Sequence, residues 1–314
     1  MAIWSDLLAR AGAKAKARGR IAINAGRRHA VAVAGTHTDG TTSVLPSPSF
    51  TGESAAIQAL AWQQAQPGRW AGSVVLHPMD YRILQLDAPK VPEAERRDAL
   101  RWLMRDQIDF AIEDASIDGV EVPGPSLGTR SDKIIAVVAP AERIRDWMQR
   151  YRQQRCALET IDIPEFAMRN LAVLATGQSA AALVHIGLRV TRVTIVWQQE
   201  LCAFRQLELS ARQLADATEP ERLAILDRLA LDIQRTADAF TRQFHGADLK
   251  KLLLSSLAQV ELVQERLIEM TGLDVQRFRI EDHVNWPAGH AVFDLKQELD
   301  YTLAVGAALR PLAH

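Results

Sequence analysis

The chain has 314 residues, 48% of them hydrophobic, which is enough for about two globular domains with packed cores. Its 37 basic and 38 acidic residues leave a formal net charge of −1, so the composition provides no general attraction to nucleic acid or to anionic lipid. Two cysteines without metal-ligand spacing argue against a disulfide framework, and no apolar run approaches the roughly 18 to 20 residues of a membrane span, which together favour a cytoplasmic protein.

Residues 1–20 form a basic amphipathic segment, in which apolar residues recur at helical spacing and Asp6 is the only acid. Three interpretations stay open, because such a segment can lie on the inner membrane surface, dock on its own domain, or fray. Its apolar positions are Ile3, Trp4, Leu7, Leu8 and Ala11, and its basic positions are Arg10, Lys14, Lys16, Arg18 and Arg20.

The first half of the chain, residues 21–176, opens with a strand, a glycine turn and a second strand over residues 21–33. A third strand and a helix complete one α/β unit. The order then changes to β-α-β-β-α, which predicts a subdomain of ferredoxin-like type inserted at about residues 71–155. The predicted strands are 41–45, 72–76, 81–86, 115–122, 133–139 and a strand ending at Pro164, and the predicted helices are 53–66, 92–109, 141–154 and 165–175.

The second half, residues 177–314, opens with a hairpin over 183–195 that is similar to the first one. Two halves that each contain a hairpin sheet covered by helices predict a duplicated α/β fold. The last helix is expected to return to the first half. The predicted strands are 191–197, 200–207, 251–254 and 274–278, and the predicted helices are 218–243, 257–270 and 298–309.

The two glycine turns carry the main functional signal. Asn24 precedes Gly26 and His185 precedes Gly187 at the same spacing. Facing glycine hairpins can bind the phosphates of ATP through backbone N–H groups, but that chemistry also needs carboxylates to hold Mg²⁺. Asn24 and His185 occupy the positions where acids are required, and bulky Arg27 follows Gly26. The pattern therefore favours structural turns over a catalytic site.

Other catalytic motifs are missing from the sequence. It has no phosphate loop ending in Gly-Lys-Ser/Thr, no dinucleotide fingerprint, no nucleophile elbow and no zinc-protease motif. We therefore expect no enzymatic activity, no catalytic residue and no metal ligands.

Three segments, residues 99–118, 161–170 and 304–310, resemble PilM-like proteins of type IV pilus assembly. Within that group they are most similar to MshI-type proteins of MSHA pilus biogenesis. The resemblance implies a duplicated actin-like (ribonuclease H-like) α/β fold of the FtsA/PilM type, with the inserted subdomain in its first half.

The resemblance also has consequences for nucleotide binding. PilM-like proteins that bind ATP use an aspartate in each phosphate hairpin and a Gly-Gly loop around the adenosine. Here Asn24 and His185 replace the aspartates, and Ser255-Ser256 stands where the paired glycines would be. The implied protein is a scaffold with a degenerate nucleotide site, which does not hydrolyse ATP and needs no cofactor.

By the same resemblance, the groove between the first half and its inserted subdomain receives the N-terminal cytoplasmic peptide of a PilN-type inner-membrane protein. An extended peptide in such a groove gains affinity from main-chain pairing and specificity from pockets. The implied protein is cytoplasmic and peripheral to the inner membrane, and the assembly motor ATPase is a further possible partner. The residues nearest the family motif are Trp102, Asp106, Ile108, Phe110 and Ile112, each of which could instead belong to the core of the subdomain.

Two alternatives remain open at the level of the sequence. The first is a nucleotide-gated adaptor that binds ATP, with or without Mg²⁺, through backbone and arginine contacts. The second is a GspL-like cytoplasmic module of type II secretion. GspL-like chains continue into a membrane span, whereas this sequence ends at Pro311-Leu-Ala-His314, which favours the pilus protein.

Overall fold

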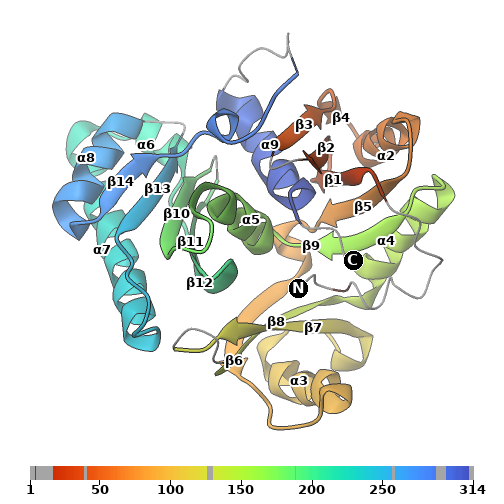
Figure 1. The fold of residues 1–314 in the computed structure, drawn as a ribbon, viewed down its shortest axis with the longest axis horizontal. Coiled ribbons are helices and arrows are strands. Elements are labelled where there is room, and N and C mark those ends of the chain that lie inside the picture. Colours follow the sequence, from red (N-terminus) through yellow and green to blue (C-terminus); the bar gives the residue numbers. More distant parts are fainter. Residues whose placement is uncertain are drawn as a thin grey trace.

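The computed structural model describes residues 4, 17–38, 41–125, 130–187, 189–256, 259–287 and 295–310. Most of the predicted N-terminal segment, with the exception of Trp4 and residues 17–20, lies outside the described residues. Within the described part, two large mixed sheets and one small sheet form the frame of the molecule (Figure 1).

The two large sheets have the same topology. The first runs in the order β3-β2-β1-β5-β9, with β4 paired to β2, and the second runs β12-β11-β10-β13-β14. In both, the first two pairings are antiparallel and the last two are parallel. This match confirms the predicted duplication. The strands are β1 (Gly19–Ala25), β2 (His29–Thr38), β3 (Thr41–Pro46), β4 (Phe50–Thr51), β5 (Trp70–Val75), β9 (Leu158–Asp162), β10 (Ala181–Ile186), β11 (Thr191–Trp197), β12 (Glu200–Leu207), β13 (Lys251–Ser256) and β14 (Asp274–Arg277).

Helices cover both faces of each large sheet, which explains why the central strands read as nearly continuous apolar runs. On β1, Ile21 and Ile23 face α2, whereas Ala22 faces α9. On β10, Val184 faces α7 and α8, whereas Leu183 faces α5. The helices are α2 (Ala55–Ala65), α5 (Pro164–Thr176), α6 (Ala211–Asp216), α7 (Glu219–Gln243), α8 (Val260–Thr271) and α9 (Leu295–Ala308).

The two inner helices exchange partners between the halves. Helix α9 follows the second sheet but packs on β1, β2 and β5 of the first, as expected from the sequence. The sequence predicts α5 as part of the first half. In the structure it packs instead on β10, β11 and β12 of the second sheet (Figure 1). The apolar face of α5 that carries Met168 and Leu171 matches the inner face of the second sheet. The helices α5 and α9 therefore lie together between the two sheets.

Helices α5 and α9 approach each other closely at Gly306. A Cβ atom on Gly306 would lie 2.2 Å from the carbonyl oxygen of Ala167, so only glycine fits there without a shift of the backbone. The amide of Asn170 donates a hydrogen bond to the Gly306 carbonyl oxygen at 2.8 Å. This contact fixes how the two halves meet.

The small sheet is the inserted subdomain, in the order β6-β8-β7 with antiparallel pairing. The predicted start at residue 71 is wrong by one strand, because β5 pairs with β1 and β9 and therefore belongs to the first large sheet. Val74 and Val75 of β5 are buried on opposite faces of the large sheet. The elements of the subdomain are β6 (Arg82–Asp87), α3 (Arg96–Met104), β7 (Ala115–Pro123), β8 (Arg130–Pro140) and α4 (Ala141–Gln153).

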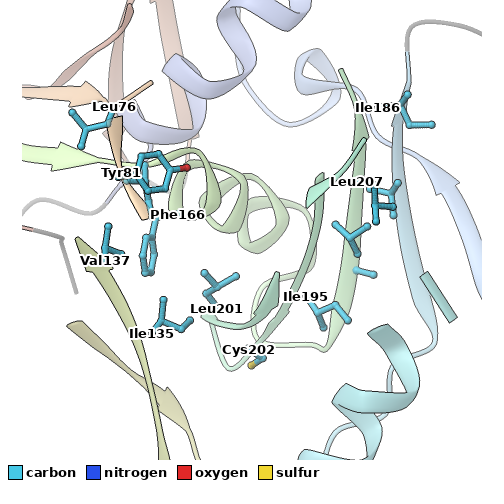
Figure 2. Packing of buried hydrophobic residues seen from close by; sticks show 14 of the residues in the cluster. Leu76, Tyr81, Ile135, Val137, Phe166, Ile186, Ile195, Leu201, Cys202 and Leu207 are labelled. Carbon is cyan, nitrogen blue, oxygen red and sulfur yellow. The ribbon is translucent and has the colours of Figure 1, made fainter. Parts of the chain in front are cut away.

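The subdomain sheet has two different apolar faces. Its outer face carries Ile117 and Ile134, which pack against Leu100 and Met104 of α3. Its inner face, which includes Val137, joins the main core of the molecule. Figure 2 shows Val137 and Ile135 of β8 on the side of the subdomain that faces Leu201 of β12.

The predicted helix over 92–109 is shorter in the structure. A 3₁₀ turn over Glu93–Glu95 precedes α3, and a second one over Arg105–Gln107 ends it. Ile108 then takes an extended conformation and packs, partly buried, against the core beneath α3. The chain leaves the helix early because this packing requires Ile108 to turn towards the sheet.

Candidate functional site at the junction of the two halves

The two glycine turns are built in the same way. The Gly26 N–H donates to the His29 carbonyl at 2.8 Å, and the Gly187 N–H donates to the Val190 carbonyl at 3.0 Å. The two glycines differ in the space around them. A Cβ atom on Gly187 would lie 2.9 Å from the Val190 oxygen, whereas the nearest atom to a Cβ on Gly26 would be 3.8 Å away. Only Gly187 is therefore required by its own turn.

His185 is a buried structural residue. On β10 it lies between Arg192 of β11 and Ser255 of β13, and its Nδ1 is 3.1 Å from the Ser255 hydroxyl. Burial first, and Arg192 second, lower the pKa of His185 to about 3. The imidazole is therefore neutral at pH 7 and cannot take the place of a carboxylate. Ser256, which follows Ser255 at the end of β13, pairs with Ile186 of β10.

Asn24 occupies the matching position in the first half. It is half-buried on β1, between Val31 of β2 and Val75 of β5. Its side chain is a neutral amide, which offers one carbonyl oxygen where a metal-binding hairpin has a carboxylate. Both hairpins thus lack an anionic group at the corresponding point.

Arginines from both hairpins act electrostatically on His77, in the loop that follows β5. The pKa of His77 is lowered, first by burial and then by Arg189, Arg27 and Arg192, while Asp80 acts in the opposite direction. Arg27 and Arg189 are exposed on the two turns. The Nε–H of Arg192 is buried and has no hydrogen-bond partner within the described part of the chain. The junction between the halves is therefore rich in cationic groups.

Two carboxylates lie close to this junction, and the sequence did not single them out as site residues. Glu165 is buried at the start of α5, where it accepts a hydrogen bond of 2.6 Å from the Tyr81 hydroxyl. Burial raises the pKa of Glu165, and the Tyr81 hydrogen bond and Arg192 oppose that rise. Asp162, at the end of β9, accepts two hydrogen bonds from Arg310. The sequence feature that could have identified these two carboxylates is the run Asp162-Ile-Pro-Glu165, in which the end of a strand is followed by a proline and an acid.

The group implied by the resemblance to PilM-like proteins is ATP with Mg²⁺, and the residues present do not fit it. Asn24 is neutral, His185 is neutral and hydrogen-bonded to Ser255, and the nearby carboxylates of Asp162 and Glu165 already have partners. Among the residues that the structure describes, no group of His, Cys, Asp and Glu is arranged to hold a metal ion. The arrangement offers cations for an anion but no ligands for its metal.

The five residues predicted to contact a partner lie together, but not in the expected groove. They are in or just after α3, which covers the outer face of the subdomain sheet, away from the first half (Figure 1). The side chains of Ile108, Phe110 and Ile112 are partly buried against the core beneath α3. This placement follows from the split of the sheet into an outer and an inner apolar face.

Trp102 and Asp106 are the exposed members of this group. Trp102 is 71% exposed, and the Arg105 guanidinium lies over its ring at 4.8 Å from the centroid. The same guanidinium donates to Asp106 at 3.2 Å. Next to them Leu103 is 46% exposed, so α3 presents an apolar surface with charges of both signs.

Comparisons with known proteins support the fold. No family model and no curated protein matches the sequence. Among solved structures, a chain of a PilM–PilN type IV pilus biogenesis complex is 16% identical, with a TM-score of 0.65 over 93% of this chain and 98% of that chain.

Two weaker similarities add nothing to the argument. The cytoplasmic domain of EpsL, an inner-membrane component of the type II secretion system of Vibrio cholerae, is 14% identical over 90% of this chain and 94% of that one, with a TM-score of 0.45. A Bacteroides thetaiotaomicron protein with an actin-like ATPase fold is 8% identical over 90% of this chain and 95% of that one, with a TM-score of 0.48.

Within the described residues, no helix is both long enough and apolar enough to cross a membrane.

The duplicated sheets, the exchanged helices α5 and α9, and the similarity along nearly the whole chain lead to one conclusion. The protein has an actin-like α/β fold, shared with a chain of a PilM–PilN complex.

Proposed function

We propose that the protein is a scaffold of a type IV pilus assembly machine, which binds the cytoplasmic peptide of a PilN-type inner-membrane partner and does not hydrolyse ATP. The observation that carries this proposal is the shared fold over 93% of the chain with a component of a PilM–PilN complex. In this proposal the protein is cytoplasmic and peripheral to the inner membrane, and the pilus is of the MSHA type. The assembly motor ATPase is a further partner.

The inserted subdomain is the proposed partner-binding unit. Trp102 is an exposed aromatic side chain, and exposed tryptophans are common energetic centres of protein interfaces. Leu103 adds apolar area beside it, and Arg105 and Asp106 supply polar groups at its rim. Ile108, Phe110 and Ile112 support this surface from beneath.

The absence of ATP hydrolysis is proposed from the chemistry of the junction. A hydrolytic site needs a metal ion and a group that positions water, and both depend on carboxylates at the hairpins. Asn24 and His185 cannot supply them, and Ser255 is held by His185.

The arginines favour a second candidate, in which the junction binds ATP without hydrolysing it and the nucleotide regulates partner binding. Its supporting observation is that Arg27, Arg189 and Arg192 all act to lower the pKa of His77. Guanidinium groups bind phosphates without a metal ion. A change in melting temperature with ATP in the absence of Mg²⁺ would favour this candidate.

Calorimetric titration tests the proposal directly. The probe is a synthetic peptide with the N-terminal cytoplasmic residues of the PilN-type protein from the same genome. We expect saturable binding of this peptide and none of the corresponding peptide from a type II secretion assembly protein. Saturable binding of the secretion peptide alone would assign the chain to type II secretion instead, and binding of neither at about 1 mM would contradict the proposal.

A further inference from the structure

Trp4 is buried against residues that are distant from it in the sequence. Its side chain is 0% exposed and belongs to the main hydrophobic core. Its backbone N–H donates to the Asp118 carboxylate oxygen Oδ2 at 2.5 Å, across 114 residues of sequence. Of the three interpretations of the N-terminal segment, docking on its own domain is therefore the one that holds for Trp4.

The position of Asp118 on β7 shows which face of the subdomain sheet Trp4 contacts. Alternate residues of a strand face the same side, so Asp118 shares a face of β7 with Val120 and Val122. Both valines belong to the main core, as does Val137, which is paired with Asp118 across the sheet. Trp4 therefore lies at the inner face of the subdomain sheet, along its edge strand β7.

The carboxylate of Asp118 is held in place to accept this hydrogen bond. Its other oxygen, Oδ1, accepts a hydrogen bond of 2.9 Å from the Gly119 N–H. The Arg97 guanidinium of α3 lies 3.9 Å from the same oxygen. A carboxylate fixed in this way can receive a backbone N–H of any segment that places an aromatic side chain in the core beside it.

Trp4 is buried beside Asp118 with one polar group unsatisfied and with an unfavourable backbone conformation. Its indole Nε1–H is buried and has no hydrogen-bond partner among the described residues, although tryptophan N–H groups usually find one when buried. Its φ angle is +53°, in the left-handed region that a non-glycine residue adopts at an energetic cost. Both features cost free energy, which lowers the net stability of Trp4 in this position.

We infer that the inner face of the subdomain sheet around Asp118 is a binding site for a tryptophan carried on a peptide segment, and that the chain's own Trp4 occupies it in cis. A tethered segment has an effective concentration in the millimolar range, so even a modest affinity keeps the site filled. The indole of Trp4 is then withheld from lipid.

The test measures, by fluorescence anisotropy, the binding of a fluorescein-labelled peptide of residues 1–16 to the full chain. The full-length variant Trp4→Ala should bind the peptide, and the wild-type chain should bind it at least about 10-fold more weakly because its site is filled. A peptide that carries Trp4→Ala should not bind. Within the Trp4→Ala chain, Asp118→Ala should abolish binding and Asp118→Asn, which keeps an acceptor, should retain it.

A second measurement covers the case in which Trp4→Ala does not fold. The wild-type chain is labelled with 5-fluorotryptophan, and the Trp4 resonance is identified by its loss in Trp4→Phe. Excess unlabelled residue 1–16 peptide should move this ¹⁹F resonance from a buried to an exposed position. Equal binding of the peptide to wild-type and Trp4→Ala chains, no binding to either, or an exposed Trp4 resonance from the start would overturn the inference. Neither experiment involves a partner protein, so its failure is separate from a failure of the proposed function.

Discussion

Arg310 and Asp162 form a buried, two-point ion pair that ties the chain just after α9 to the end of β9 in the first sheet. The Nε of Arg310 donates to Oδ2 of Asp162 at 3.0 Å, and a terminal nitrogen donates to Oδ1 at 2.8 Å. The two side chains are 4% and 0% exposed. The Arg310 guanidinium also lies over the ring of Phe166 on α5. One arginine therefore connects the last helix, the first sheet and the helix between the sheets.

Replacing Arg310 by alanine should destabilise the protein by about 3 to 5 kcal/mol, because Asp162 would remain buried without its partner. The free energy of unfolding in urea measures this effect. The matched control is Arg212→Ala, which removes an exposed arginine paired with Asp216 and should cost less than about 0.5 kcal/mol. Equal stability losses for the two variants would show that the pair does not hold α9 in place.

Gly306→Ala should destabilise the contact between α5 and α9. The new Cβ would lie 2.2 Å from the Ala167 oxygen, so the helices must move apart, at a cost of about 1 to 3 kcal/mol. Gly26→Ala is the control, since its Cβ would meet nothing nearer than 3.8 Å. Thermal unfolding should give a clearly lower melting temperature for Gly306→Ala and almost no change for Gly26→Ala. A melting temperature for Gly306→Ala equal to that of the wild type would be inconsistent with the packing described.

His185 should make the stability of the protein depend on pH. Burial lowers its pKa from 6.5 to about 3, so below pH 6.5 the unfolded chain binds a proton that the folded chain does not. The stability from the neutral imidazole is full above pH 6.5 and is lost as the pH falls towards 3, with a slope of up to ~1.4 kcal/mol per pH unit.

The variant His185→Asn isolates this contribution, because the amide can keep a hydrogen bond with Ser255 but does not titrate. Urea unfolding of both chains at several values between pH 7 and pH 5 gives the difference in slope. We expect the wild type to lose more stability than the variant over this interval. Parallel curves would mean that His185 is already accessible to protons in the folded protein.

Magnesium and ATP together should not change the melting temperature of the protein, and the protein should not hydrolyse the ATP. A ligand at about 100 times its Kd stabilises a fold by about 2.7 kcal/mol, which is a shift of several degrees. We expect a shift in melting temperature of less than about 1 °C with Mg-ATP, and phosphate release no faster than in a sample without protein. Phosphate release that exceeds this background and disappears in Gly187→Trp would refute the assignment as a scaffold without ATPase activity.

The sequence was sufficient to predict the duplicated halves, since the spacing of Asn24 to Gly26 matches that of His185 to Gly187. The matched turns and sheet orders follow from that repeat. The lack of an acid at the first turn could also be anticipated, because residue type alone shows that Asn24 is not an acid. In the structure His185 proves to be neutral as well.

Features that depend on long-range packing could not be predicted. Nothing local distinguishes β5, which joins the large sheet, from the strands of the subdomain that follow it. The hydrogen bond between Tyr81 and Glu165 joins residues 84 positions apart, and nothing in the sequence around Glu165 indicates that Tyr81 is its partner. The same holds for Trp4 and Asp118. The outer position of α3 depends on which face of the small sheet meets the main core, and amphipathic periodicity does not specify it.

The affinity of the PilN-type cytoplasmic peptide for surface variants of this chain tests the central claim most directly. Trp102→Ala removes the exposed aromatic side chain of α3, and Leu223→Ala removes a 41% exposed apolar side chain from α7 as a control. We predict that both variants unfold at the wild-type urea concentration, that Trp102→Ala binds the peptide at least about 10-fold more weakly, and that Leu223→Ala binds it normally. Wild-type affinity in a correctly folded Trp102→Ala variant would contradict the account.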